Sequence, residues 1–331
     1  MDVCGNYCNK KHNNQNSKEK YSLGKVKVMN PTLNTKPSPL TVRKPRREGR
    51  PRKRALLIAV SYKKQKYELK GTINDVKKMK DWLMFNYDFK LANILILTEE
   101  EADEEHLSPT KKNIEIGMKW LMEESKSGDS LVFYFSGHGL RQPDFEGDER
   151  DGMDECICPV DFMEAGMILD NQIYSTIVRP LIKGVTLHAI IDACHSGTVL
   201  DLPYMYNRET KKWEDNSPPS GAIKQTSGGL AITFGACRDD QMAADTNAFS
   251  PADLKMSGAL TFTLTRSIEK RGREITYGEL LDDIYNEIER ADQDGCLLIR
   301  LFKKLLNQRL FQKPQLCASE PFDVYKKKFA L

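Results

Sequence analysis

The sequence lacks the marks of a membrane-spanning or secreted chain. No run of about 18 apolar residues occurs, and the start, MDVCGNYCNK, is not a basic patch followed by an apolar segment. We therefore predict neither a membrane span nor a secretory signal, and we expect the protein in the cytoplasm. An internal repeat is also missing, while 40% hydrophobic residues are enough for a sizeable core.

A disulfide framework is lacking as well. The eight cysteines are scattered, so each is expected to be a thiol, a metal ligand or a nucleophile. Cys4 and Cys8 supply half of a zinc site, but His12 is the only histidine near them, and we expect no zinc. Cys156 and Cys158 lie in an apolar run and are interpreted as packing residues.

Charge is divided unevenly along the chain. Residues 1–54 carry 15 Lys and Arg against 3 Asp and Glu, whereas the rest has a net charge of −9. The leading segment has no hydrophobic period, so we expect a disordered basic arm over residues 1–54. Its run RKPRREGRPRKR (43–54) fits a nuclear address or a nucleic-acid contact, and equally a solvated linker. The acidic body lacks aromatic–basic interleaving, which disfavours nucleic-acid binding.

Short apolar runs predict a buried sheet in the body of the chain. Continuous apolar runs are typical of strands covered on both faces, as in parallel sheets. The expected strands are RALLIAVS (54–61), NILILT (93–98), SLVFYFS (130–136), TLHAIID (186–192) and LAITFGA (230–236). The expected helices are INDVKKMKDWLMF (73–85), TKKNIEIGMKWLMEES (110–125), NQIYSTIVRPLI (171–182), SGALTFTLTRSIEK (257–270) and TYGELLDDIYNEIER (276–290). This alternation predicts a three-layer α/β/α sandwich with a mostly parallel central sheet.

Two of these strands end in residue types that are costly to bury. His138 comes just past the third strand, and Cys194 comes just past the fourth. Chemistry in open parallel sheets gathers beyond the carboxyl ends of the strands, so neighbouring strands would bring imidazole and thiol together. An imidazole that takes the thiol proton and later protonates a leaving amine is cysteine peptidase chemistry. The N–H groups of Gly139 and Cys194 are candidate oxyanion donors.

Other interpretations of these residues stay open. A lone cysteine in an apolar run is usually a small core residue. His188 lies inside the fourth strand and is interpreted as a packed histidine, and His195 would point away from Cys194 if the strand direction persists. Cys237 follows another strand end, where a subsidiary redox role is open. We therefore favour His138 as the base.

Three blocks of sequence stand out in the body of the chain: YFSGHG (134–139), DGMDECICPVDF (151–162) and DACHSGTVLDLPY (192–204). They resemble the signatures of type I metacaspases, which are cysteine peptidases of the caspase-like (caspase–haemoglobinase) fold, and the plant members are the most similar. The closing EPFDVYKKKF (320–329) also resembles the family's last strand. The resemblance implies His138 and Cys194 as the catalytic pair, protein or peptide substrates, and a monomer.

The resemblance also implies an organisation of the chain after the basic arm. A p20-like part would span about 55–205, a processing-prone linker about 206–228, and a p10-like part about 229–331. The expected self-cleavage sites are Arg208, Lys211, Lys212 and Lys224, besides the basic arm. The alternative function is a caspase-like scaffold or thiol redox sensor with a nucleic-acid-binding arm.

Two carboxylates are expected near the thiol. Asp192 precedes Cys194 by two residues and shares its strand face, and Asp75 opens the first helix at the same edge of the sheet. Such a pair would attract Arg or Lys, although Asp75 also fits a helix N-cap. The resemblance implies cleavage after Arg or Lys and assigns Asp75, Ser136 and Asp192 to an acidic S1 pocket. Thr72 stands where some relatives have cysteine.

The acidic stretch DFEGDERDGMDE (144–155) suggests an oxygen-liganded cation or a solvated loop. It is not an EF-hand, because Glu149 stands where that loop needs glycine. The resemblance implies calcium activation, with ligands at Asp154, Asp170 and Asp201 and with Asn171 where a second consecutive Asp is usual. An amide keeps the oxygen ligand but loses one charge, so we expect weaker calcium binding.

Overall fold

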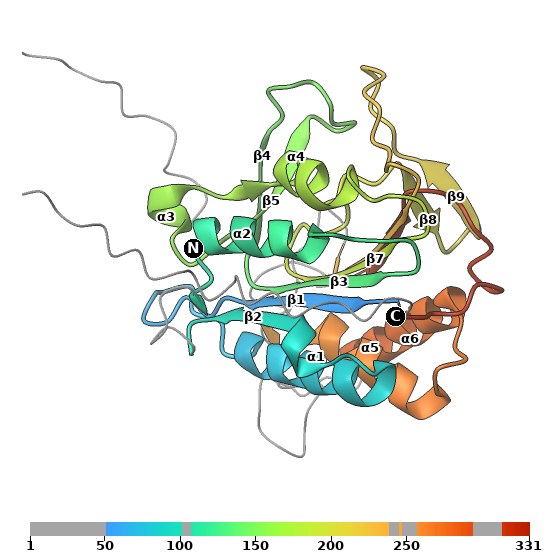
Figure 1. Ribbon diagram of the computed structural model, residues 1–331, viewed down its shortest axis with the longest axis horizontal. Coiled ribbons are helices and arrows are strands. Elements are labelled where there is room, and N and C mark those ends of the chain that lie inside the picture. The colour runs from blue at the N-terminus through green and yellow to red at the C-terminus, as the bar shows by residue number, and fades with distance from the viewer. Residues whose placement is uncertain (1–50, 101–106, 238–244, 247–256, 294–312) are drawn as a thin grey trace, which may run out of the picture. The chain divides into compact units, whose positions relative to one another are not determined.

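The computed structural model describes residues 51–100, 107–237, 245–246, 257–293 and 313–331 (Figure 1). The basic arm up to residue 50, with Cys4 and Cys8, lies outside the described residues. No helix within the described ranges is both long and apolar enough to cross a membrane.

A mixed sheet forms the centre of the described structure. Its eight strands follow the order β2-β1-β3-β7-β10-β13-β8-β9 among the described residues. The strands are β1 (Lys53–Ala59), β2 (Ile94–Thr98), β3 (Ser130–Ser136), β7 (Thr186–Asp192), β8 (Tyr204–Asn207), β9 (Lys212–Asp215), β10 (Leu230–Gly235) and β13 (Gln315–Ala318). The five from β2 to β10 run parallel, and the last three pair antiparallel. The predicted mostly parallel sheet is confirmed.

Two smaller sheets lie beside it. One contains β4 (Gly139–Pro143), β5 (Met153–Ile157) and β6 (Ile168–Leu169), and the other contains β11 (Asp245–Thr246) and β12 (Ser257–Gly258). The first extends directly from the end of β3, so it projects from the edge where His138 lies.

Helices cover both faces of the central sheet (Figure 1). One face carries α1 (Thr72–Tyr87), α5 (Ala259–Arg271) and α6 (Tyr277–Gln293). The other carries α2 (Lys111–Met122), α3 (Phe162–Ala165) and α4 (Asp170–Ile173), which continues as the π-helical segment η4 (Tyr174–Val178). A short 3₁₀ turn, η2 (Leu91–Asn93), leads into β2.

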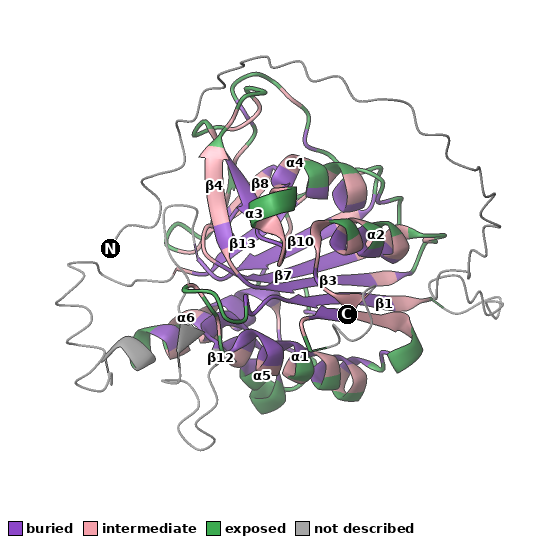
Figure 2. Cartoon of the chain, turned by 90° about the vertical axis from the view of Figure 1, so that its left-hand side faces the viewer, coloured by how far each residue is buried: buried purple, intermediate pink, exposed green. Residues whose placement is uncertain are grey.

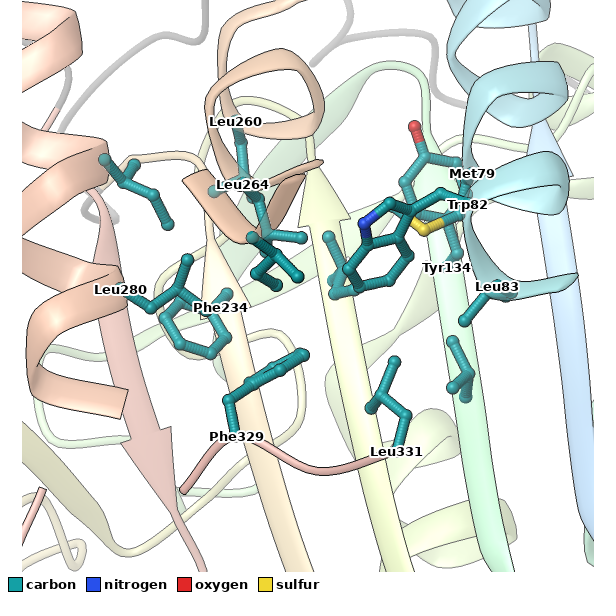
Figure 3. Close-up of a cluster of buried hydrophobic side chains, with 14 of the residues drawn as sticks. Met79, Trp82, Leu83, Tyr134, Phe234, Leu260, Leu264, Leu280, Phe329 and Leu331 are labelled. Atoms are coloured by element: carbon teal, nitrogen blue, oxygen red, sulfur yellow. The ribbon is translucent and has the colours of Figure 1, made fainter. Parts of the chain in front are cut away.

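Side-chain alternation along the strands builds a core on each face. In β1, Ala55, Leu57 and Ala59 join one hydrophobic cluster, whereas Leu56 and Ile58 join the other. Figure 2 shows the strands buried between helices whose outer faces are exposed. In Figure 3 the α1 side chains reach the sheet and meet the C-terminal residues; the labelled members of this packing include Met79, Trp82, Leu83, Tyr134, Phe329 and Leu331. The predicted three-layer sandwich is confirmed.

The N-caps of α1 and α2 can be compared with the residues expected there. Thr110 caps α2 as predicted, because its side chain accepts a hydrogen bond from the N–H of Asn113. The alternative interpretation of Asp75 as an N-cap is wrong. Gly71 occupies the N-cap of α1, and Asp75 lies inside the first turn with its side chain buried.

The predicted last strand at 320–329 is also wrong. The last strand is β13, and the chain beyond it makes turns: the Asp323 carboxylate accepts the Tyr325 N–H, and the Asp323 carbonyl accepts the N–H groups of Lys326 and Lys327. An Asx-turn of this kind bends the chain away from a ladder. Phe329 still reaches the core, where it is fully buried.

The segment expected to be a linker begins with ordered structure. Strands β8 and β9 form a hairpin whose Asn207 side chain accepts two N–H groups of the turn, and Trp213 Nε1 donates to the Phe322 carbonyl at 2.7 Å. Beyond the linker, β10 pairs with β7, so the two expected parts of the peptidase domain build one sheet.

Candidate active site

His138 and Cys194 leave the sheet at the same edge. Strands β3 and β7 are parallel neighbours in which Ser136 lies opposite Asp192, and each candidate residue follows two positions later. The main chains stay in contact beyond the ladder, because a side chain at Gly139 would collide with the carbonyl oxygen of Cys194. The predicted adjacency of the two strand ends is confirmed.

The His138 ring has a defined orientation. Its Nε2 lies 2.7 Å from the carbonyl oxygen of Tyr67, and a carbonyl only accepts, so the neutral ring carries its hydrogen on Nε2. The lone pair is therefore on Nδ1, the nitrogen that can take a proton. The ring also packs on that of Tyr62, with 4.6 Å between the ring centroids.

Tyr62 joins the main chain at His138 to the main chain at Cys158. Its hydroxyl accepts the His138 N–H at 2.9 Å and donates to the Cys158 carbonyl at 2.6 Å. Burial raises the pKa of Tyr62 well above its ordinary value, so the hydroxyl keeps its proton. The residue adopts a positive φ of 52°, a conformation uncommon outside glycine. Sequence reasoning missed Tyr62, although it follows the end of β1 at the same edge.

Replacing Tyr62 with phenylalanine should slow turnover while leaving KM nearly unchanged. The variant removes the acceptor of the part-buried His138 N–H and the donor to the buried Cys158 carbonyl, and an unsatisfied buried group costs about 1–3 kcal/mol. We expect a lower melting temperature and a several-fold fall in kcat, measured by thermal denaturation and peptide cleavage. Tyr67→Phe is the matched control, because Tyr67 contacts His138 Nε2 through its main chain. Wild-type kcat in Tyr62→Phe contradicts this role.

Cys194 differs from the other described cysteines in its exposure. It is half-buried, whereas Cys156, Cys158, Cys237 and Cys317 are buried. Burial raises the pKa of Cys158 to about 12 and that of Cys237 to about 12, so both stay thiols at neutral pH. The Cys237 thiol donates to the Ala193 carbonyl at 3.4 Å, beside the candidate nucleophile. Packing roles for Cys156 and Cys158 are confirmed, and the redox role of Cys237 stays a prediction.

The chain turns sharply immediately after Cys194. His195 has a φ of 49°, so the strand direction does not persist. The buried Ser196 hydroxyl accepts the Ala236 N–H at 2.9 Å, which ties this turn to the end of β10. His188 is a packed histidine, as predicted: burial lowers its pKa to about 3, and its Nε2 lies 2.5 Å from Tyr277 Oη.

The three expected pocket residues, Asp75, Ser136 and Asp192, lie together near the carboxyl ends of β3 and β7. Asp75 Oδ2 accepts the Gly258 N–H at 2.9 Å and the Ser136 hydroxyl at 3.5 Å. Asp192 Oδ2 accepts the N–H and hydroxyl of Thr261 at 2.8 and 2.6 Å, and a side chain at Gly258 would collide with this carboxylate. Both aspartates are buried, so two negative groups meet around one glycine near the candidate thiol.

Six carboxylates gather in a second place, the acidic cluster. Three overlapping groups of their oxygens each lie within 4.8 Å of one another. The cluster comprises Asp144, Asp148, Glu149, Asp154, Asp170 and Asp201. Of the three predicted aspartate ligands, Asp154 and Asp170 share one group, whereas Asp201 belongs to another. Glu149 belongs to both groups, and the Asn171 amide oxygen borders the cluster. Asp148 and Glu149 were missed as individual residues, although the density of acids in 144–155 was the signal.

The cluster suits a hard cation with oxygen ligands. Asp154 is 3% exposed, and its Oδ1 has no hydrogen-bond partner among the described residues. Burial raises the pKa values of Asp154, Asp170 and Asp201, because the interior penalises charged carboxylates. Calcium prefers six to eight oxygen ligands drawn from carboxylates, carbonyls and amides, so the donor set fits it.

A thiol and an imidazole past adjacent parallel strands of an α/β/α sandwich define the class of caspase-like cysteine peptidases. A family model described as "Metacaspase, peptidase C14 domain" matches residues 53–203. Metacaspase-1 of Arabidopsis thaliana is 46% identical over 292 residues, covering 85% of this chain and 79% of the relative. Metacaspase-1B of Neurospora crassa is 34% identical over 312 residues, covering 82% and 68%. The chain belongs to the metacaspase family.

Other comparisons agree with this assignment. Metacaspase-2 of Arabidopsis thaliana is 46% identical over 307 residues, covering 84% of this chain and 72% of the relative. The crystal structure of protein GSU0716 from Geobacter sulfurreducens superimposes with a TM-score of 0.53 at 18% identity, covering 85% of this chain and 98% of that one. That likeness concerns the fold. The predicted plant-like metacaspase is confirmed, and the chain is a cysteine peptidase by family.

Proposed function

We propose that this metacaspase is an endopeptidase that cleaves after Arg or Lys through His138 and Cys194. The observation that carries the proposal is the alignment of β3 and β7, which places the imidazole and the thiol past neighbouring strand ends. The same edge holds the paired carboxylates of Asp75 and Asp192. The proposed catalytic pair and the proposed specificity pocket therefore lie at the same edge of the sheet.

The catalytic cycle follows from the orientation of the ring. His138 Nδ1 takes the Cys194 thiol proton, and the thiolate attacks the carbonyl carbon of the scissile bond. The Nδ1 proton then goes to the leaving amine, and water later releases the acyl group with His138 again acting as base. The Tyr67 carbonyl holds Nε2–H and stabilises the imidazolium. The N–H groups of Gly139 and Cys194 are the proposed oxyanion donors.

Specificity follows from charge in the pocket. A guanidinium or ammonium that enters beside Asp75 and Asp192 would pair with two buried carboxylates, whereas an aspartate side chain would meet like charge in a site of low dielectric. Ser136 Oγ adds a neutral polar contact beside Asp75. A neutral side chain would gain no such pairing with either carboxylate.

Calcium is the proposed activator, held by Asp154, Asp170, Asp201 and the Asn171 amide oxygen. When bound, it would supply the positive charge that the cluster needs. The acidic loop joins β4 to β5, and β4 begins at Gly139, next to His138, so ordering this loop also supports the catalytic edge.

Self-processing is proposed at the β8–β9 turn first. Lys211 and Lys212 are exposed there, whereas Arg208 pairs with Asp282 at 2.6 Å and Lys224 is buried. Exposed turns are preferred sites of proteolytic cleavage. The cytoplasmic or nuclear location and the monomeric state stay predictions from the sequence.

Fluorogenic peptides that differ only at the P1 residue test the proposed function. With calcium, we expect kcat/KM for Arg and Lys to exceed that for Asp by at least about 100-fold. A chelator should abolish cleavage, and calcium should restore it. A preference for Asp contradicts the pocket assignment, and cleavage that is independent of calcium contradicts the cation assignment while leaving the His138–Cys194 pair intact.

A further inference from the structure

Lys224 places its ammonium group inside the acidic cluster. Nζ lies 2.6 Å from Asp148 Oδ2, 2.8 Å from Asp201 Oδ2 and 3.1 Å from Glu149 Oε1. The Asn171 amide oxygen is a further neighbour at 3.1 Å. Lys224 is 7% exposed, which is unusual for a lysine. Two of these four neighbours, Asp201 and Asn171, are among the proposed calcium ligands.

One ammonium group does not satisfy this cluster. It offers three donors and a single charge, whereas the cluster holds six carboxylates. Within the described part of the chain, Asp154 Oδ1 stays unpartnered, and no oxygen of Asp154 or Asp170 is among the atoms that contact Nζ. A divalent cation carries twice the charge and accepts more oxygen ligands, so it would fit the same oxygens better than the lysine does.

The segment that carries Lys224, residues 217–226, contains no strand or helix, and most of its residues are exposed. Its neighbour Ile223 is 74% exposed. A cavity of about 500 Å³ separates the segment from residues 203–204 and 319–321. The Tyr174 hydroxyl lies within hydrogen-bond distance of the Ile223 and Gln225 carbonyls, at 3.2 and 2.9 Å. Lys224 and Pro218 are the two buried residues of the segment, so the Lys224 side chain is its main polar anchor.

We infer that Lys224 is an internal occupant of the cation site, which calcium must displace, so that cation binding releases residues 217–226. The inference rests on the proposed calcium activation and adds its mechanism. The ammonium holds the Asp201 Oδ2 and Asn171 Oδ1 oxygens that the cation would use, and two cations this close would repel each other. Displacement exposes Lys224 itself, a residue of the type after which this peptidase is proposed to cleave. Processing at Lys224 would therefore follow cation binding.

Calcium titration calorimetry tests the competition in a Cys194→Ala background, in which self-cleavage is blocked. Lys224→Met keeps the length of the side chain and removes its charge, so calcium no longer has to displace an ammonium group. We expect calcium chloride to bind Lys224→Met at least about tenfold more tightly than the parent protein, because an occupied state lowers apparent affinity. Lys212→Met, which removes an exposed lysine, should leave the affinity unchanged.

Equal or weaker binding by Lys224→Met overturns the inference while leaving calcium activation in place. No calcium binding by either protein overturns both, so the two failures are distinguishable. Limited trypsin digestion of the Cys194→Ala protein provides a second readout with Lys224 intact. Calcium should increase cutting at Lys224 by at least about tenfold and leave cutting at Lys212 unchanged, as quantified by mass spectrometry. Protection of Lys224 that persists in saturating calcium contradicts the proposed release.

Discussion

Cys194→Ala should reduce kcat for an Arg-terminated peptide by roughly 10⁴- to 10⁶-fold, with the fold intact. The alanine removes the sulfur that attacks the carbonyl, and the other described cysteines are buried and cannot replace it. His138→Ala should have a comparable effect, because the thiol then loses the base that accepts its proton. Single-turnover and steady-state cleavage in saturating calcium measure both losses.

The double variant separates a catalytic pair from two independent contributions. Residues that act as one unit are strongly non-additive, so Cys194→Ala/His138→Ala should be about as slow as either single variant. Cys237→Ala is the matched control: this thiol is buried next to Ala193, and its loss should change kcat by less than about tenfold. A double variant whose loss of kcat equals the product of the two single losses would contradict the proposed pair. Substantial activity in Cys194→Ala would contradict it too.

Strand ends could be predicted from the sequence because local chemistry marks them. The runs at 130–136 and 186–192 coincide with β3 and β7, and each gives way abruptly to glycine, histidine or cysteine. The order of the strands was a conditional expectation, since pairing β3 with β7 joins residues more than 50 positions apart. The structure met that condition, and the position of the candidate pair follows from it.

Elements that depend on a distant partner were not predictable in the same way. Tyr62 follows β1 as an ordinary tyrosine in the sequence, and its role depends on His138, 76 residues later. Lys224 lies in a polar segment, and the oxygens that bury it come from the loop at 148–149, from α4 and from Asp201. A lysine is normally solvated, so composition alone places it on the surface.

Asp75 shows how a local rule fails when a distant contact intervenes. An aspartate near a helix start usually caps the helix, but Asp75 accepts the N–H of Gly258, 183 residues later, and Gly71 occupies the cap. The residue pattern predicted a carboxylate at this edge near the thiol, and the resemblance to the family favoured a pocket role over a cap. The same tertiary contact brings it to Asp192, whose carboxylate faces the same glycine.

Asp192→Asn should cause the second large effect, a loss of charge recognition at P1. The carboxylate is 6% exposed and bonded to Thr261, so asparagine keeps the shape and one acceptor but removes the charge. Buried charge pairs are worth about 2–5 kcal/mol, and about 2.7 kcal/mol corresponds to 100-fold. Citrulline is a neutral near-isostere of arginine, so comparing peptides with arginine and with citrulline at P1 isolates the contribution of the substrate charge. The arginine-to-citrulline ratio of kcat/KM should fall by about 100-fold in Asp192→Asn.

The ratio distinguishes charge recognition from a structural role. Asp192 also receives the Thr261 N–H in the first turn of α5, so a variant that merely disturbs this helix would slow both peptides equally. Asp81→Asn removes one exposed negative charge from α1 and should leave the ratio unchanged, which controls for the net charge of the protein. An equal loss of kcat/KM for both peptides would make Asp192 a positioning residue for α5. Asp75 would then be the carboxylate that binds the substrate cation. A selective loss for arginine requires the negative charge of Asp192 to act directly on the substrate cation.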